Sequence, residues 1–481
     1  MHLFVCTVMY LLVLLFDWCE IYGLMTIFGF YSAIVFAILL FSELRQKGIG
    51  LLAIYLAFSF LRLIFPTIQM SLGAADGEKY SYQFNYTDYI FPCSIAMNMY
   101  YMLFVIGLTY FAKDKSLSLN IDKLFKIRHI SKYITIMFGV GFVAQIVSEL
   151  LTIFANPIIN ILSALSLLAI MLMAFHCAYS ETKSLKRLFV IFIIIQEFYA
   201  IFFGFYKGGV VSPLFFYLLY YYLHCRNVGK RILNGKFVLY LILAILFVYY
   251  FVYPFMTIKR DEAQWDPTIG VVNYNYSTID IIIRVFNGEE GNYVMESKSD
   301  AISDRQNSLT TNAYFYMSAI KNGYQQVLIN NVFIYFVPKW LGGEGIDITK
   351  APGSLATSYM RDGNFSFGED EYATFSNIGM FGSGYFYGGW LATIVFCLFN
   401  AWLISALLHF ASNNTSNIFA LLLFVQIISA AISCYEEVAD AGMYRAKTWL
   451  LYFILAILLD RIVMLKKKHL GIRKNSYENI D

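Results

Sequence analysis

The charged residues of one long polar stretch, from about Thr257 to Gly384, are the first candidates for chemistry. Arginine suits a phosphate group because its planar guanidinium donates two parallel hydrogen bonds and stays charged. Arg284 follows an apolar run in TIDIIIRVFNG, which places it near a lipid surface, at the depth of a lipid pyrophosphate. The same pattern fits an arginine that reaches to the membrane interface or pairs with a loop carboxylate. The other arginines of the stretch are Arg260, Arg305 and Arg361.

An acidic cluster, Glu369, Asp370 and Glu371, supplies candidates for a general base. Adjacent carboxylates repel one another, which raises the pKa of at least one of them. Such a carboxylate can take the proton from a sugar hydroxyl, although a solvated acidic turn has the same pattern. All six histidines lie outside the polar stretch, so it offers neither a histidine base nor a histidine-based metal site. We therefore expect no metal and no cofactor.

Aromatic residues of the same stretch are candidates for holding a sugar. Tyr314, Tyr316 and Tyr324 each offer a ring face on which a sugar ring can stack. Most of the 38 tyrosines of the chain are instead expected to anchor it at the membrane interface.

The elements that must position these residues are long apolar blocks. Of the 481 residues, 59% are hydrophobic and only 14% are charged, whereas a soluble domain carries about 25% charged residues. Blocks of about 20 apolar residues recur, each long enough to cross a bilayer core. We predict an all-α polytopic membrane protein with twelve spans, at about 3–17, 21–42, 49–69, 90–112, 132–154, 157–179, 188–205, 209–225, 237–257, 385–410, 416–435 and 446–464.

The placement of lysine and arginine sets the orientation, because short cytoplasmic loops of membrane proteins are rich in both. The basic loops all fall on one side of the predicted layout: 43–48, 113–132, 181–187, 226–236 and the tail after Arg461. Both termini are therefore expected in the cytoplasm, with the long polar stretch outside between spans nine and ten. The predicted organisation is spans over 1–257, an outer loop over 258–384, spans over 385–464 and a basic cytoplasmic tail over 465–481.

Two further expectations concern smaller features. Within the outer loop, Ala313 to Ile329 is expected to form a helix lying in the membrane interface. The seven cysteines form no C-x-x-C pair and are expected to pack between helices. The first apolar block lacks a basic leader and a small-residue cleavage site, so we interpret it as a retained helix.

Four pieces of the outer loop carry a family resemblance. They are IIIRVFNG, YFVPKWLGGE, KAPG and GEDEYATFSNIGMFG, in that order, within about 278–390. Together with many spans and one large late outer loop, they resemble the Wzy-type O-antigen and oligosaccharide repeat-unit polymerases. Two departures stand out. Lys339 occupies a place where arginine is common in the family, and KAPG separates a lysine and a proline that are usually adjacent.

The resemblance implies a glycosyltransferase that joins undecaprenyl-pyrophosphate-linked oligosaccharides at the periplasmic face of the bacterial inner membrane. Its expected partners are that lipid-linked oligosaccharide, membrane lipid and a chain-length regulator protein, with no nucleic acid. No nucleotide sugar is needed, since the lipid pyrophosphate is already a good leaving group. The implied catalytic residues are Arg284, Glu369 and Glu371, and the implied substrate-binding residues are Arg305, Lys339, Arg361 and Tyr324.

Other classes of protein fit parts of the pattern. An O-antigen ligase would look similar, but it is usually associated with a histidine in the outer loop. A polyprenyl-phosphate-sugar-dependent glycosyltransferase needs an acidic site in the first outer loop, where Asp17 and Glu20 lie. A lipid-linked oligosaccharide flippase, which is not an enzyme, would use charges inside the spans, which are expensive in lipid. Those charges are Arg62, Glu149 and Glu197.

Overall fold

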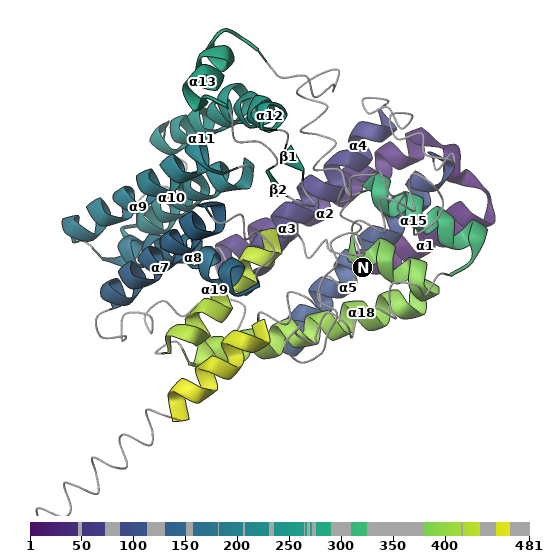
Figure 1. Ribbon diagram of the computed structural model, residues 1–481. Helices are drawn as coiled ribbons and strands as arrows, with labels where there is room; N and C mark the ends of the chain where they lie inside the picture. Colours follow the sequence, from purple (N-terminus) through teal and green to yellow (C-terminus); the bar gives the residue numbers. More distant parts are fainter. Residues whose placement is uncertain are drawn as a thin grey trace, which may run out of the picture. The chain divides into compact units, whose positions relative to one another are not determined.

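The chain divides into two compact units. The computed structural model describes residues 1–46, 51–72, 87–112, 130–150, 157–180, 182–204, 207–229, 235–263, 265–266, 270–271, 276–289, 309–324, 379–414, 417–432 and 449–461 (Figure 1). Unit 1 consists of Met1–Asn120 and Ser299–Asp481, and unit 2 of Ile121–Lys298. The outer loop predicted over 258–384 is therefore divided between the units. Its residues up to Lys298 belong to unit 2, and those from Ser299 belong to unit 1.

Long apolar helices dominate both units, which confirms the prediction of a multi-pass helical membrane protein. Seven helices of the described residues are long and apolar enough to cross a membrane: Tyr22–Arg45, Leu51–Ser71, Ile90–Ala112, Ile130–Ser148, Leu162–Tyr179, Val238–Glu262 and Met380–Asn413. Shorter apolar helices cover His2–Leu15, Gly209–Cys225 and Ile418–Ile428. The remaining predicted spans, 188–205 and 446–464, coincide with a helix at Lys183–Phe202 and with helical residues 449–461.

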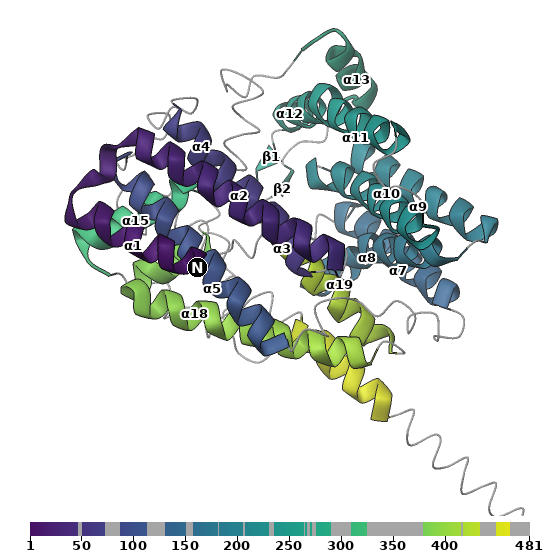
Figure 2. The ribbon, with the colours of Figure 1, turned by 180° about the vertical axis from the view of Figure 1, so that it is seen from behind.

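Unit 1 is built around α5 (Ile90–Ala112), which contacts α1, α15 and α18 (Figure 2). Its span is the most deeply buried of the seven. A Cβ atom added at Gly107 would lie 2.9 Å from the Cβ of Ala401, so the glycine allows α5 and α18 to approach closely. The other elements of the unit are α1 (His2–Leu15), η1 (Trp18–Glu20), α2 (Tyr22–Gln46), α3 (Leu51–Ser59), η2 (Phe60–Ile64), α4 (Phe65–Ser71), η4 (Thr87–Tyr89), α15 (Leu309–Asn322), α18 (Met380–Asn413) and α19 (Ile418–Ile432).

Unit 2 contains a helical bundle and, at one end, a short hairpin and a small helix. Its helices are α7 (Ile130–Leu150), α8 (Pro157–Tyr179), α9 (Lys183–Phe202), α10 (Lys207–Asn227), α11 (Gly235–Phe247), η5 (Val248–Val252), α12 (Tyr253–Glu262) and α13 (Thr278–Phe286). The antiparallel hairpin of β1 (Trp265–Asp266) and β2 (Gly270–Val271) pairs Trp265 with Val271. It therefore lies in the chain between α12 and α13.

Two spans contain a π-helical turn, and a proline explains each. In η2 the wide turn precedes Pro66, and in η5 it precedes Pro254. Proline has no N–H to donate to the carbonyl four residues earlier, so the helix widens there instead of breaking. Arg62 lies within η2, in the middle of the Leu51–Ser71 span.

Candidate functional site

Arg284 lies in the last turn of α13 and is held by two carboxylates. The helix begins with a side-chain cap, since Ser277 Oγ accepts a hydrogen bond from the backbone N–H of Asp280 at 3.3 Å. Arg284 Nε donates to Glu289 at 2.6 Å, and Nη1 forms an ion pair with Glu262 at the end of α12. Hydrogen bonds to Glu289 and then Glu262 raise the pKa of Arg284 further above its usual value. A pyrophosphate at this arginine would have to compete with both glutamates.

Beneath α13 lies an apolar cluster that fixes its position in unit 2. Ile281 and Val285 of α13 pack with Phe255, Met256 and Ile258 of α12. Ala200 of α9, Val210 of α10 and Val252 of η5 complete the buried set. The helix therefore presents one apolar face to the protein and leaves its other sides outside the cluster.

Lys259 is a buried cation to which the sequence analysis gave no role. It is fully enclosed in α12, and its Nζ donates at 2.8 Å to the carbonyl of Ile201 and at 2.8 Å to that of Gly204. These carbonyls lie at the end of α9, where the helix dipole favours a positive charge. The rings of Phe255 and Tyr276 lie 5.9 and 5.7 Å from Nζ. In the sequence, the apolar neighbours Met256 and Ile258 were the sign that Lys259 is buried.

In unit 1, α15 lies inside the bundle, which differs from the helix expected in the membrane interface. Tyr314, Phe315 and Tyr316 point to successive sides of the helix, and all three are buried. A helix with large aromatic side chains on successive sides must be covered by protein or lipid on each of them. Buried Asn312 ties α15 to α18, because its Oδ1 accepts a hydrogen bond from the N–H of Gly382 at 2.7 Å.

The helix that α15 contacts, α18, folds back on itself at two glycines. Gly388 has φ −172° and ψ 31°, and Gly389 has φ 61° and ψ −148°, a conformation that is essentially restricted to glycine. The rings of Phe381 and Trp390 are 5.9 Å apart, whereas nine residues of straight helix advance about 14 Å. The hydroxyl of Thr393 donates to the freed carbonyl of Gly389 at 2.9 Å. The predicted span over 385–410 is therefore interrupted near its start, at Gly388 and Gly389.

A cluster of aromatic side chains holds this broken helix to α1 and α15. The hydroxyls of Tyr10 and Tyr316 share a hydrogen bond of 2.5 Å, and the ring of Tyr385 lies 4.6 Å from that of Tyr316. Trp390 meets the Tyr10 ring edge-on at 5.7 Å. Burial raises the pKa of Tyr316, and the neighbouring Tyr10 raises it further. Tyr316 is therefore a neutral hydrogen-bonding group at any ordinary pH.

Tyr324, predicted to hold a sugar, lies against the break of α18. Its side chain is 59% exposed. A Cβ atom added at Gly389 would lie 2.5 Å from its hydroxyl oxygen, so the ring occupies the space that only glycine leaves open. The other predicted site residues, Glu369, Glu371, Arg305, Lys339 and Arg361, lie outside the described residues. Arg284 belongs to unit 2 and Tyr324 to unit 1.

Carboxylates from two connections of unit 1 gather near Cys19. Burial raises the pKa of the Cys19 thiol, and Asp17, Asp88 and Glu20 raise it further. Asp17 has φ 53°, an uncommon conformation for a residue other than glycine. Lys321 of α15 places its Nζ 5.4 Å from the ring of Tyr89, beside Asp88. Within the described part of the chain, no three such side chains are placed to share a metal ion.

The three charged residues that a transport path would use, Glu197, Glu149 and Arg62, differ in their surroundings. In unit 2, one carboxyl oxygen of Glu197 is buried and accepts no hydrogen bond from the residues that the structure describes. Glu149 lies at the end of α7, and its side chain is outside the described set. Arg62 lies in η2 of unit 1.

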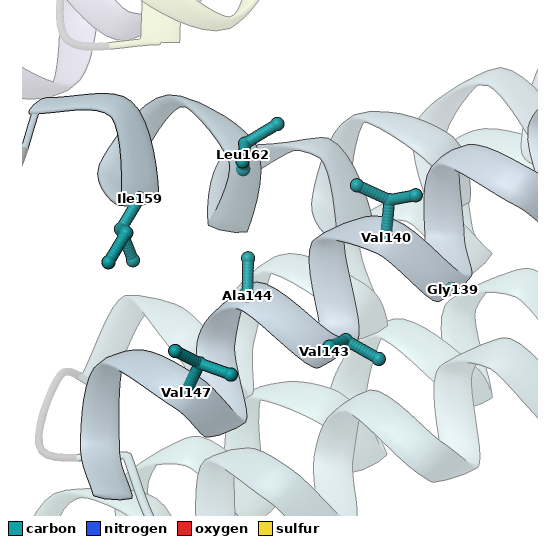
Figure 3. A pocket seen from close by; sticks show the side chains of 7 residues that line it. All are labelled: Gly139, Val140, Val143, Ala144, Val147, Ile159 and Leu162. Carbon is teal, nitrogen blue, oxygen red and sulfur yellow. The ribbon is translucent and has the colours of Figure 1, made fainter. Parts of the chain in front are cut away.

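An apolar groove of about 430 Å³ runs along α7 and α8 (Figure 3). The two helices approach closely at Gly141, where an added Cβ would lie 2.2 Å from the backbone nitrogen of Ser166. The lining is entirely aliphatic: Gly139, Val140, Val143, Ala144, Val147, Ile159 and Leu162. Such a groove suits a hydrocarbon chain and offers nothing to a sugar or a phosphate.

The long apolar helices and the buried cores of both units define the class, a multi-pass helical membrane protein. No family model, curated protein or solved structure matches this chain. Its activity is therefore argued from its own residues.

Proposed function

We propose that this protein is a polymerase of undecaprenyl-pyrophosphate-linked oligosaccharide units in the bacterial inner membrane, with twelve spans and both termini in the cytoplasm. The observation that carries the proposal is the position of Tyr324, exposed against the fixed break of α18. An exposed ring beside a broken helix offers an apolar face next to backbone groups, which suits a sugar ring. In many transporters broken helices form the substrate site, where the ends of the half-helices bind charged groups.

In the proposed reaction, an acceptor hydroxyl oxygen attacks the anomeric carbon of the lipid-linked chain. The carbon–oxygen bond to the pyrophosphate breaks, undecaprenyl pyrophosphate leaves, and the hydroxyl proton passes to a carboxylate. Arg284 would offset the charge that collects on the leaving group. To do so it must exchange one of its two glutamate partners for a phosphate oxygen.

The test is the length distribution of the surface polysaccharide in a deletion strain that carries plasmid-borne variants. Arg284→Ala is expected to abolish the ladder and leave single repeat units on the lipid core, at unchanged protein level. The matched control is Glu262→Gln combined with Glu289→Gln, which frees the same arginine and should keep the ladder. A normal ladder for Arg284→Ala removes Arg284 from the mechanism. Loss of even the single unit points to export or an earlier transfer and overturns the proposal.

A second candidate function is supported by the carboxylates near Cys19. A polyprenyl-phosphate-sugar-dependent glycosyltransferase would take its base from Asp17, whose strained backbone and acidic neighbours fit such a role. In that case Asp17→Asn should abolish transfer of a single sugar, while Arg284→Ala leaves it intact. The opposite pattern favours the polymerase.

A further inference from the structure

We propose that α13 rests in the outer leaflet of the membrane and anchors this end of unit 2 to lipid. Its outer stripe consists of Ile279, Ile283 and Phe286, which are 64%, 52% and 78% exposed. Their spacing, i, i+4 and i+7, places all three on one side of the helix. A stripe of this kind in water is unfavourable, since large apolar side chains are stabilised by removal from water.

The surface next to the outer stripe indicates that lipid covers it. The ring of Phe286 lies 6.0 Å from that of Phe251 in η5. Phe251 belongs to the span Val238–Glu262, which is the least buried of the seven membrane-crossing helices. Its apolar side chains, among them Ile245 and Tyr250, are exposed in the same way. The outer stripe therefore continues a surface that the bilayer already covers.

The charges of α13 are arranged as this position requires. Asp280 and Arg284 lie on a different side of the helix from the outer stripe. The guanidinium of Arg284, the one cation of α13, is paired with Glu262 and Glu289, so no unpaired cation lies beside the outer stripe. The inner face, with Ile281 and Val285, is already committed to the apolar cluster of unit 2. Lipid is the remaining environment that suits the outer stripe.

The experiment places a photoreactive benzoylphenylalanine at single positions of the full-length protein in nanodiscs of phosphatidylethanolamine and phosphatidylglycerol. Position 286 tests the outer stripe and replaces one aromatic residue by another. Position 280 is the control on the polar side of the same helix. Position 245, in the exposed face of the span, shows that lipid capture works. After irradiation, mass spectrometry measures the lipid and peptide adducts at each position.

We expect lipid adducts at 286 in a yield similar to that at 245 and several-fold higher than at 280. Equal yields at 286 and 280, or adducts at 245 alone, would overturn the proposal. Adducts of 286 with the adjoining span are compatible with the proposal, because the Phe286 ring lies 6.0 Å from that of Phe251. Adducts with any other part of the protein, without lipid adducts, would overturn it as well, because protein would then cover the outer stripe. The result does not depend on the proposed polymerase activity, since no substrate is present.

Discussion

The helices α13 and α15 have opposite environments, although both belong to the polar stretch between the spans Val238–Glu262 and Met380–Asn413. In α13 only Ile281 and Val285 are buried, and the other side carries exposed apolar residues. In α15 every residue from Asn312 to Ala319 is buried. Composition alone therefore does not predict whether such a helix lies at the surface or inside the bundle. What matters is whether large side chains lie on one side of it or on all sides.

The strongest test of this contrast is to remove a buried ring from α15. Tyr316→Ala is expected to cost about 3–5 kcal/mol of stability, because it deletes a fully buried aromatic side chain. The measurement is the thermal unfolding of the protein in detergent. Ile283→Ala in α13 is the control and should change stability by about 0.5 kcal/mol or less, as for most exposed sites. Equal losses in the two variants would contradict the contrast between the helices.

The second test concerns the contact of Lys259 with the carbonyl groups at the end of α9. Lys259→Met keeps the length of the side chain but leaves the carbonyls of Ile201 and Gly204 without their donor. The expected cost is about 1–3 kcal/mol, measured by the same unfolding assay. Lys183→Met, at the exposed start of α9, should be nearly neutral. A neutral Lys259→Met would mean that water replaces the ammonium group there.

An effect of similar size is expected at the break of α18, the helix that α15 contacts. Gly389→Ala forces a side chain into a conformation that costs about 1–3 kcal/mol and pushes on Tyr324. Gly388→Ala is the milder comparison, because its φ of −172° is open to any residue and its added Cβ would lie 3.1 Å from the Cβ of Ala392. Under the proposed function, Gly389→Ala should also shorten the polysaccharide ladder more than Gly388→Ala does. Equal stability and equal ladder length in the two variants would show that the break of α18 has no special role.

The smallest expected effect concerns the hydroxyl pair that links α15 to α1. Tyr316→Phe removes one hydrogen bond and leaves the hydroxyl of Tyr10 without this partner, at an expected cost of about 1 kcal/mol. The double variant Tyr10→Phe with Tyr316→Phe should cost less than the sum of the two single variants, since both singles remove the same hydrogen bond, while the neighbouring hydroxyl of Tyr385 remains in all three. A double variant that is less stable than the sum of the singles would contradict this account.

Local sequence patterns predicted much of the fold and little of the site. The predicted span 90–112 matches α5, because apolar length alone determines it. The burial of Lys259 and the position of α15 were not predicted, since both depend on partners distant in the chain. The glycines of GSGYFYGGW are a sequence sign of a break in α18. They do not predict the direction in which the helix folds back. Pairing with a loop carboxylate was one of the alternatives for Arg284, while the identity of its partners, Glu262 and Glu289, 22 and 5 residues away, comes from the fold.

The hydroxyl pair of Tyr10 and Tyr316 has a consequence for the making of the protein. The two residues are 306 positions apart, and ribosomes add roughly 5–20 residues per second, so roughly 15–60 s separate their synthesis. During that time α1 can already dock on α5, but its tyrosine has no partner from α15. The end of unit 1 that holds this pair must therefore close late, when the nascent chain has delivered most of its helices to the membrane.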